Sequence, residues 1–271
     1  ASFYDINAKV NFVINERNML QLSGYKSHDF FKLNSDTSYT YHNLNGSLSW
    51  KHSFNDRFSF TTVGVFSEYR YNVGSTSDSL NAFDLTYGIR HFEGKIDFHY
   101  LPGDNHKIRF GANFIKYSLN PGAIEPKYEE SILAVRLNSE QGIESALFVN
   151  DEINISHWFM LNLGFRYTLF HSLGPATVYK YADNSPRNIE SRMDSVFYKR
   201  NAVTGHYGYP EWRVSARFQL SPFNSIKASY TTMSQYIHML TNTMAVSPTD
   251  TWTLSNPNRK PQKSRQWMQR P

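Results

Sequence analysis

The chain has 271 residues, of which 40% are hydrophobic and 16% aromatic. It contains no cysteine, which excludes disulfide frameworks and thiolate metal sites. The net charge is +5, but the basic residues are scattered, so the charge pattern predicts no nucleic-acid partner. No stretch approaches the roughly 18 apolar residues of a membrane-spanning helix, whereas a membrane β-barrel hides its apolar residues at every second position.

The first residue is Ala, and no signal peptide precedes it, so we expect a mature form, a processed form or a fragment. Strict alternation of apolar and polar residues then predicts two β-hairpins, at 5–14 with 19–25 and at 41–54 with 57–71. The polar stretch 26–38 between them is expected to be a loop. The alternation blurs at Val63 and Val65, which we interpret as a β-bulge at Gly64.

Three further hairpins follow the same period-two pattern. Their expected strands are 84–101 with 106–117, 143–156 with 158–170, and 211–220 with 225–238. The connections between hairpins, 72–83, 118–142 and 171–206, are long and polar. The connections within hairpins, at 16–18, 55–56, 102–105, 156–157 and 221–224, are very short and rich in turn-forming residues.

These features predict an all-β, antiparallel transmembrane β-barrel with about ten strands in this chain. Outer-membrane barrels have long strands, short periplasmic turns and long external loops. A soluble β-sandwich or propeller is the alternative, but it would not explain the two classes of connection. Nor would it explain the aromatic residues near the strand ends, which membrane interfaces favour; these are Trp50, Phe54, Phe58, Tyr100, Trp158, Phe159 and Trp212.

A short turn follows the first strand and precedes the tenth, so both ends of the chain are expected on the external side. Complete bacterial barrels start and finish in the periplasm, and we therefore expect residues 1–271 to be part of one larger barrel domain. The tail 240–271 is interpreted as an external loop with at most the first residues of an eleventh strand.

The alternation also predicts which side chains face lipid and which face the lumen. In the last hairpin, Trp212, Val214, Ala216, Phe218 and Leu220 are expected to face lipid. Four basic residues are expected to face the lumen: Arg166, Arg213, Arg217 and Lys227. Asp151 has the parity of a lipid-facing residue, so it is expected near a membrane interface or beside a bulge.

The sequence contains no nucleophile elbow, phosphate-binding loop or zinc-protease motif, so we expect no enzyme, no catalytic residue and no cofactor. His91, Glu93, Asp97 and His99 could share one face of a strand. However, His91 and His99 would lie about 26 Å apart, at about 3.3 Å per residue, too far for one metal ion.

The long connection 171–206 is the candidate ligand surface, because it combines aromatic and basic residues. The candidate ligand-binding residues are Tyr179, Tyr181, Arg187, Arg192, Tyr198 and Arg200. The alternative is a solvated loop that contacts anionic lipopolysaccharide or nothing. Asp250 and Trp252 are interpreted as residues that shape their own loop.

Two segments resemble TonB-dependent outer-membrane receptors. The first has Phe148, Asp151-Glu152 and Gly164-Phe165-Arg166-Tyr167. The second has Ser229-Tyr230, Gln235-Tyr236-Ile237-His238, Pro248-Thr249-Asp250-Thr251-Trp252 and Pro261-Gln262-Lys263-Ser264, and resembles the late barrel of Bacteroidetes-type receptors. The resemblance covers the whole chain in architecture and about 90 residues in motif.

This resemblance implies a 22-stranded barrel in the bacterial outer membrane, with a plug that binds the TonB complex. Neither the plug nor the C-terminal strands are recognisable here. The implied function is energy-coupled uptake of a scarce or large solute, such as a siderophore, vitamin, glycan or peptide. Outer-membrane lipid and a surface lipoprotein are the other implied partners. The alternatives are a porin or adhesion barrel without energy coupling and a ten-stranded outer-membrane protease.

Overall fold

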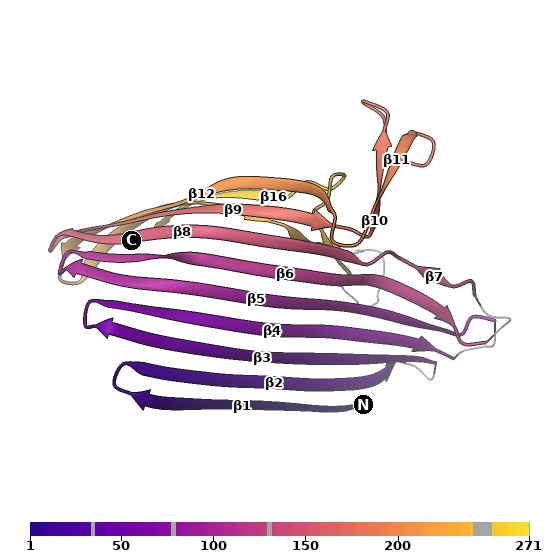
Figure 1. Ribbon diagram of the computed structural model, residues 1–271, viewed down its shortest axis with the longest axis horizontal. Coiled ribbons are helices and arrows are strands. Elements are labelled where there is room, and N and C mark those ends of the chain that lie inside the picture. Colours follow the sequence, from indigo (N-terminus) through magenta and orange to yellow (C-terminus); the bar gives the residue numbers. More distant parts are fainter. Residues whose placement is uncertain (34–35, 77–79, 129–131, 241–250, 271) are drawn as a thin grey trace.

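The computed structural model describes residues 1–33, 36–76, 80–128, 132–240 and 251–270. All the secondary-structure elements assigned in these residues are β-strands, so none of the described residues form a membrane-spanning helix. Eleven strands follow one another in an antiparallel meander (Figure 1). They are β1 Ser2–Asn15, β2 Asn18–Leu33, β3 Thr37–Asn55, β4 Phe58–Ser75, β5 Phe83–Gly103, β6 His106–Pro126, β8 Glu140–Ser156, β9 Phe159–Leu173, β12 Val203–Ser221, β13 Asn224–Gln235 and β16 Gln262–Arg270.

Five shorter strands lie off this path. β7 (Val135–Arg136) pairs with β6. β10 (Ala176–Tyr181) and β11 (Arg192–Tyr198) form one two-stranded sheet, and β14 (Ile237–Leu240) and β15 (Thr251–Leu254) form another. The expected fold class, an all-β antiparallel sheet with long strands and tight hairpins, is confirmed.

The tail of the chain returns to the sheet further than its sequence predicts. We expected only the first residues of an eleventh strand there, but Gln262–Arg270 pairs with β13 over its whole length, from Gln235↔Gln262 to Lys227↔Arg270. The aromatic pair Tyr230 and Trp267, with ring centroids 4.2 Å apart, packs across these two strands. The pairing explains why a polar sequence still forms a strand: the edge of β13 offers a complete backbone ladder.

The strands also extend beyond the alternating segments. The polar stretch 26–38 was expected to be a loop, but β2 continues to Leu33 and β3 begins at Thr37. Likewise, β6 continues to Pro126, and β10 and β11 form within the connection 171–206. Alternation disappears where both faces of a strand are polar, while backbone hydrogen bonding continues. The pattern therefore marks the apolar band rather than the ends of the strands.

The bulge expected at Gly64 is wrong. Gly64 pairs with Leu48 on one side and with Gly94 on the other, and both registers pass through it without a shift. Val63 and Val65 therefore lie on the same face as Ser59, Thr61 and Ser67, and no change of phase is needed to explain them.

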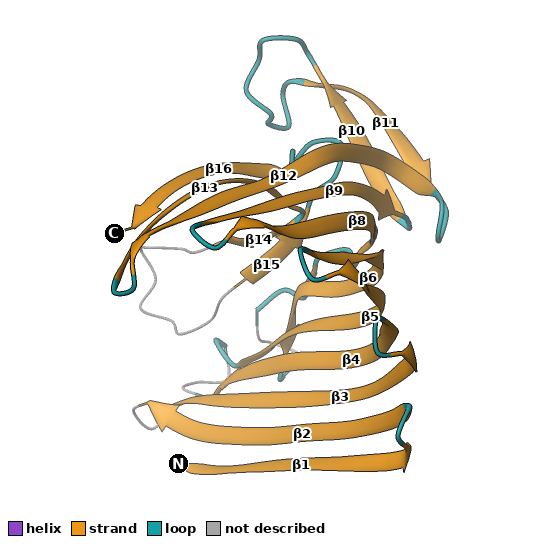
Figure 2. Ribbon diagram, turned by 90° about the vertical axis from the view of Figure 1, so that its left-hand side faces the viewer, coloured by secondary structure: helices purple, strands orange, loops and turns teal. Residues whose placement is uncertain are grey.

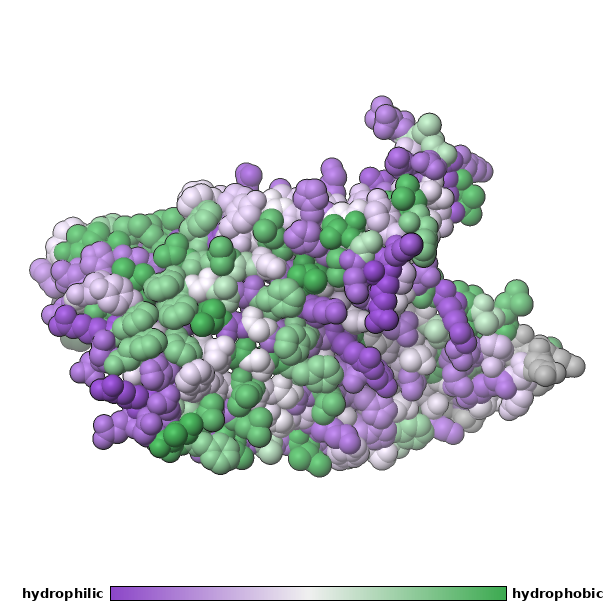
Figure 3. All heavy atoms as spheres, viewed as in Figure 1, coloured by the Kyte–Doolittle hydropathy of each residue, from purple (hydrophilic) through white to green (hydrophobic). Residues whose placement is uncertain are grey.

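The sheet is curved, and its two faces differ in chemistry. Figure 2 shows the curvature of the sheet from the side, with β14 and β15 on its concave side. The face turned toward the viewer in Figure 3 is the convex one, where apolar side chains spread over the middle of the strands and hydrophilic ones gather toward their ends. Many of the convex apolar side chains are exposed, including Leu48, Leu147, Leu163 and Trp212. A face of this kind suits contact with lipid.

Aromatic residues gather on this convex face near the short turns. Phe54 stacks on Phe58 with ring centroids 5.0 Å apart, and Phe159 stacks on Phe218 at 4.6 Å. Amphipathic and aromatic rings are favoured at the boundary between hydrocarbon and headgroups. This arrangement matches the aromatic girdle expected from the sequence.

Candidate functional site

The concave face contains a cavity of about 660 Å³ between β5, β6, β8, β9 and β12. Residues that pair across neighbouring strands share a face, so the alternating polar positions of these five strands meet there. Its charged and amide-bearing lining residues are Glu93, Lys95, Arg109, Asn113, Asn150, Asn162, Glu144, Arg166, Glu211 and Arg213.

The charges around this cavity are largely paired with one another. The Arg166 guanidinium donates to Glu144 Oε1 at 3.1 Å and lies 4.0 Å from Glu211 Oε2. The Tyr117 hydroxyl donates to Glu144 at 3.2 Å. Such a network keeps the surface wet and polar while fixing the position of each side chain. It can bind a polar solute or a polar protein surface through hydrogen bonds.

The four basic residues expected to face the lumen all lie on the concave face. Arg166 and Arg213 line the cavity, and Arg166 is the register partner of Glu211. Arg217 and Lys227 are register partners on β12 and β13, closer to the short turn. The Arg217 guanidinium donates a hydrogen bond to the Gln219 side chain at 2.9 Å. Their role in a lumen stays a prediction.

The histidines and carboxylates of β5 form two separate pairs. His91 Nε2 lies 3.5 Å from Glu93, and His99 Nε2 lies 3.6 Å from Asp97. Among the described residues, no group of three or more histidine, cysteine, aspartate or glutamate side chains is placed to hold a metal ion.

Asp151 keeps the lipid-facing parity predicted from the sequence. The β8 register with β6 and with β9 is continuous at this residue, so no bulge turns its side chain inward. Its carboxylate lies 2.8 Å from Nδ1 of His106, at the start of β6 beside a short turn. Of the two expectations for Asp151, a bulge or a position near the membrane interface, the structure agrees with the position near the interface.

The candidate ligand residues lie on and around the β10–β11 hairpin, which rises from the end of the sheet that carries the long connections (Figure 1). Arg192 stacks its guanidinium 4.0 Å from the centre of the Tyr179 ring. Tyr181 is the register partner of Arg192, and Arg187 donates to the backbone carbonyl of Asn258. Asn258 in turn donates to the Tyr179 carbonyl at 3.1 Å, so Arg187 is linked to the other three residues through Asn258.

Tyr198 and Arg200 lie apart from that group. Tyr198 pairs with Ala176 at the base of the hairpin, and Arg200 is exposed in the turn that follows. A second cavity, of about 320 Å³, lies between β10 and residues 254–259, and Tyr179 is the one candidate that lines it. All six assignments stay predictions.

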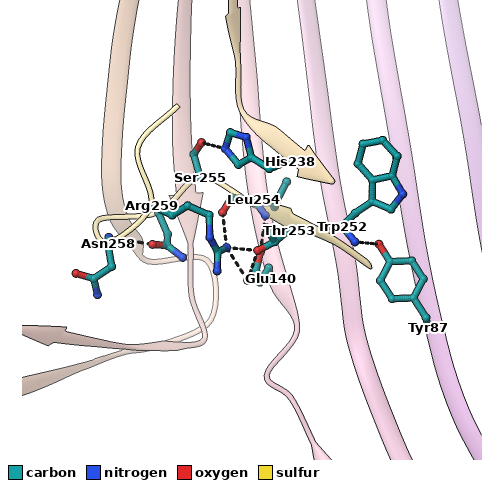
Figure 4. Close-up of polar contacts among 10 residues, drawn as sticks. Tyr87, Glu140, His238, Trp252, Thr253, Leu254, Ser255, Asn258 and Arg259 are labelled. Carbon is teal, nitrogen blue, oxygen red and sulfur yellow. Dashed lines mark hydrogen bonds and ion pairs between the residues drawn. The ribbon is translucent and has the colours of Figure 1, made fainter. Parts of the chain in front are cut away.

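β14, β15 and residues 255–259, which we call the folded-back segment, lie over the concave face, and β8 anchors them (Figure 4). Glu140, the first residue of β8, accepts hydrogen bonds from Thr253 Oγ1 at 2.9 Å and from the Leu254 backbone N–H at 2.6 Å. Arg259 joins the same group through Glu140, Thr253 and the Leu254 carbonyl at 2.9 Å. One carboxylate thus holds the segment by its backbone and by two side chains.

Apolar packing supports this anchor. Leu254 is buried in a cluster with Tyr117, Phe170 and Tyr236, in which the Phe170 and Tyr236 rings stack at 4.8 Å. Gly142 faces the Phe170 ring so closely that a Cβ there would lie 2.7 Å from it. A side chain at this position would displace the ring on which the segment packs.

Trp252 belongs to the loop structure, as the sequence suggested. Its backbone N–H donates to the Tyr87 hydroxyl at 3.0 Å, and its side chain packs against the cluster around Tyr71 and Tyr87. Asp250 lies outside the described residues. The turn after β15 is local in origin: in Asn256-Pro257-Asn258-Arg259, proline presets the turn and the Asn256 side chain accepts from the Asn258 N–H at 2.9 Å.

His238 of β14 is buried in this segment, and its Nε2 lies 2.8 Å from Ser255 Oγ. Burial lowers the pKa of His238 because it disfavours the charged ring, and the nearby Arg259 guanidinium lowers that pKa further. The neutral imidazole is therefore the form that the folded segment accommodates.

Sequence reasoning did not identify Glu140, Arg259 and Tyr87 as anchors. Glu140 and Arg259 are 119 residues apart, and neither lies in a recognisable motif. By contrast, Glu144 and Glu211 could have been found, because both lie within the alternating segments 143–156 and 211–220 and have the parity of the lumen-facing side chains.

Comparison with known proteins gives one family and one fold. The family model described as TonB dependent receptor-like, beta-barrel, matches residues 2–267. No curated protein sequence matches the chain.

Three solved structures illustrate the likeness in fold. The ferric-catecholate import receptor Fiu from E. coli K12 in its closed form is 13% identical, with a TM-score of 0.61, over 86% of this chain and 43% of the receptor chain. The Serratia marcescens hemophore receptor HasR, a double mutant in complex with its hemophore HasA and heme, is 13% identical with a TM-score of 0.63, over 98% and 41%. The ferric yersiniabactin uptake receptor FyuA from Yersinia pestis is 11% identical with a TM-score of 0.59, over 98% and 42%. The chain spans about two fifths of each of these proteins.

Proposed function

The chain belongs to the TonB-dependent receptor β-barrel family of outer-membrane proteins, and from this premise we propose that the intact protein imports a scarce or large solute with energy supplied through the TonB complex. One observation carries the proposal. A curved sheet with an apolar convex face has a charged, ion-paired cavity on its concave face, and β14 and β15 lie over that face. A wall with this chemistry suits a gated, wet passage rather than a sealed core.

In this proposal residues 1–271 are one part of the barrel wall. Arg166, Arg213, Arg217 and Lys227 face the lumen, where a plug supplied by another part of the protein would contact them and bind TonB. The resemblance to Bacteroidetes-type receptors supports a surface lipoprotein as a further partner. The long connections lie outside the cell, in keeping with the loop asymmetry of outer-membrane barrels.

The β10–β11 hairpin supplies the first contact with the solute. Tyr179, Tyr181, Arg187 and Arg192 lie together on it, and Tyr198 and Arg200 lie at its base. Aromatic rings and guanidinium groups bind sugar-like or anionic solutes by stacking and by charged hydrogen bonds. The solute class stays open among siderophores, vitamins, glycans and peptides.

Uptake measurements test this function. Cells that produce the intact protein would be given labelled ferric siderophores, cobalamin, oligosaccharides and peptides in turn, with and without a protonophore. We expect uptake of one class to stop when the proton gradient is collapsed. Uptake that continues unchanged would overturn energy coupling and favour a porin.

A hairpin variant tests the capture surface within the same assay. Replacing Tyr179 and Arg192 by alanine removes the ring and the guanidinium that would stack on the solute. One such contact contributes about 0.5–2 kcal/mol, so apparent affinity should fall by roughly 2- to 30-fold. Lys180→Ala on the same strand is the control, since Lys180 pairs only with the exposed Asp194 in the described part of the chain. Equal effects of both variants would remove the hairpin from the binding surface.

A further inference from the structure

Basic side chains form a belt on the convex face, on the side of the long connections. We define this outer basic belt as Lys26, His28, His42, Arg70, Arg90 and Lys116. The register places His28, His42 and Arg70 side by side on β2, β3 and β4. It also places Glu68 beside Arg90, and Phe92 beside Lys116, so the belt continues across β5 and β6.

The belt lies where the apolar band of the convex face ends. Along β5, Arg90 comes two residues before the exposed Phe92, and along β6, Lys116 comes two residues after the exposed Phe114. Strands rise about 3.3 Å per residue and tilt by about 40°. Lys26 lies 8 residues from the short-turn end of its strand, about 20 Å in height, and the other five belt residues lie 10–13 residues from it, about 25–33 Å in height. This is the far edge of an apolar band about 25 Å tall.

Charge in the belt is only partly compensated. Glu68 accepts from both Arg70 and Arg90, the latter at 2.8 Å, yet the two arginine side chains keep 47% and 57% of their surface exposed. Lys26 and Lys116 are exposed and have no ion-pair partner among the described residues. His28 and His42 lie 3.2 Å apart between Nδ1 atoms, with the Tyr4 ring stacked on His28 at 5.6 Å. One carboxylate therefore faces four permanent cations.

We propose that the outer basic belt binds the phosphate groups of the anionic glycolipid in the outer leaflet of the outer membrane. This inference rests on the proposed function only for the orientation that puts the long connections outside the cell. Guanidinium and ammonium groups bind phosphate through charged hydrogen bonds. Below them, Phe66, Phe92 and Phe114 offer an exposed apolar surface to the acyl chains of the same molecule. A free phosphate ion would use the cations and leave this apolar surface without a partner.

Lipid binding by the purified intact protein in mild detergent tests the proposal. The probes are lipid A, lipid A without its phosphates and inorganic phosphate. A basic residue at an anionic membrane surface changes affinity by about fivefold, so the triple variant Arg70→Gln, Arg90→Gln, Lys116→Gln should bind lipid A roughly 100-fold more weakly. The matched control is Arg17→Gln, Arg57→Gln, Lys107→Gln, which removes three exposed cations at the short turns and should bind as the unmodified protein does.

A gain of affinity separates binding from misfolding. Glu68→Gln removes the one acid of the belt and should tighten lipid A binding by about fivefold. The unmodified protein should bind dephosphorylated lipid A about as weakly as the triple variant does, and millimolar inorganic phosphate should not displace lipid A. Equal lipid A affinity of the unmodified and triple-variant proteins, or displacement by inorganic phosphate alone, overturns the proposal. Solute uptake under a proton gradient is measured separately, so loss of lipid binding leaves the proposed function standing.

Discussion

Ala216→Arg should impair assembly of the barrel, whereas Arg217→Gln should leave it nearly unchanged. Ala216 lies between Leu161 and Ala228 on the convex face, and Arg217 lies opposite Lys227 on the concave face. Ala216 is five residues from the end of β12, about 16 Å along the strand and about 12 Å in height for a tilt near 40°. This is the middle of an apolar band about 25 Å tall, where an arginine costs about 2–4 kcal/mol.

The corresponding change in the ratio of folded to unfolded protein is roughly 30- to 1000-fold. The assay is the fraction of intact protein that resists unfolding by urea in lipid vesicles, together with the mobility shift between heated and unheated samples on gels. Arg217→Gln loses one hydrogen bond to Gln219 on a wet face, so its unfolding midpoint should move by no more than a surface substitution does. Equal tolerance of both substitutions would show that the two faces have been assigned the wrong way round.

The remaining predictions concern the folded-back segment. Glu140→Ala removes the acceptor of the Leu254 N–H, and hydrogen bonds to charged groups contribute about 1.5–3 kcal/mol, so hydrogen exchange at Leu254 should accelerate by roughly 10- to 150-fold. Glu125→Ala, at an exposed carboxylate, is the control and should not change that rate. Because the pKa of His238 is lowered in the folded segment, the unfolded segment binds the proton more tightly below about pH 6.5. The segment should therefore open more readily as pH falls through this value, measured as the hydrogen-exchange rate corrected for the intrinsic pH dependence of exchange. The variant His238→Gln should abolish this pH dependence. A flat profile in the unmodified protein would contradict the pKa argument.

The sequence was most informative where the apolar band crosses the strands. Residues 159–169 and 212–220 alternate without interruption, and both predicted faces agree with the register of β9 and β12. The same rule failed outside the band. It ended β2 at Tyr25 rather than Leu33 because residues 26–29 are polar on both faces and Phe30 and Phe31 lie on opposite faces, so no period remains, although the backbone still pairs with β3.

The candidate site divides in the same way. Parity alone was enough to put Arg166 and Arg213 on one face, and they line a common cavity. It was not enough to find the pairing of Arg166 with Glu144 and Glu211, because alternation along a strand says which face a side chain takes and not which neighbour it meets across three strands.

By itself, then, the sequence determined the period-two strands, the tight turns and the chemistry of each face, since these depend on neighbouring residues and on local backbone geometry. Only the tertiary structure decided how the connections are used. Glu140 and Arg259 are separated by 119 residues and meet because β8 begins beside the segment that follows β13. A contact of that kind depends on the register and curvature of the whole sheet, and no local pattern encodes it.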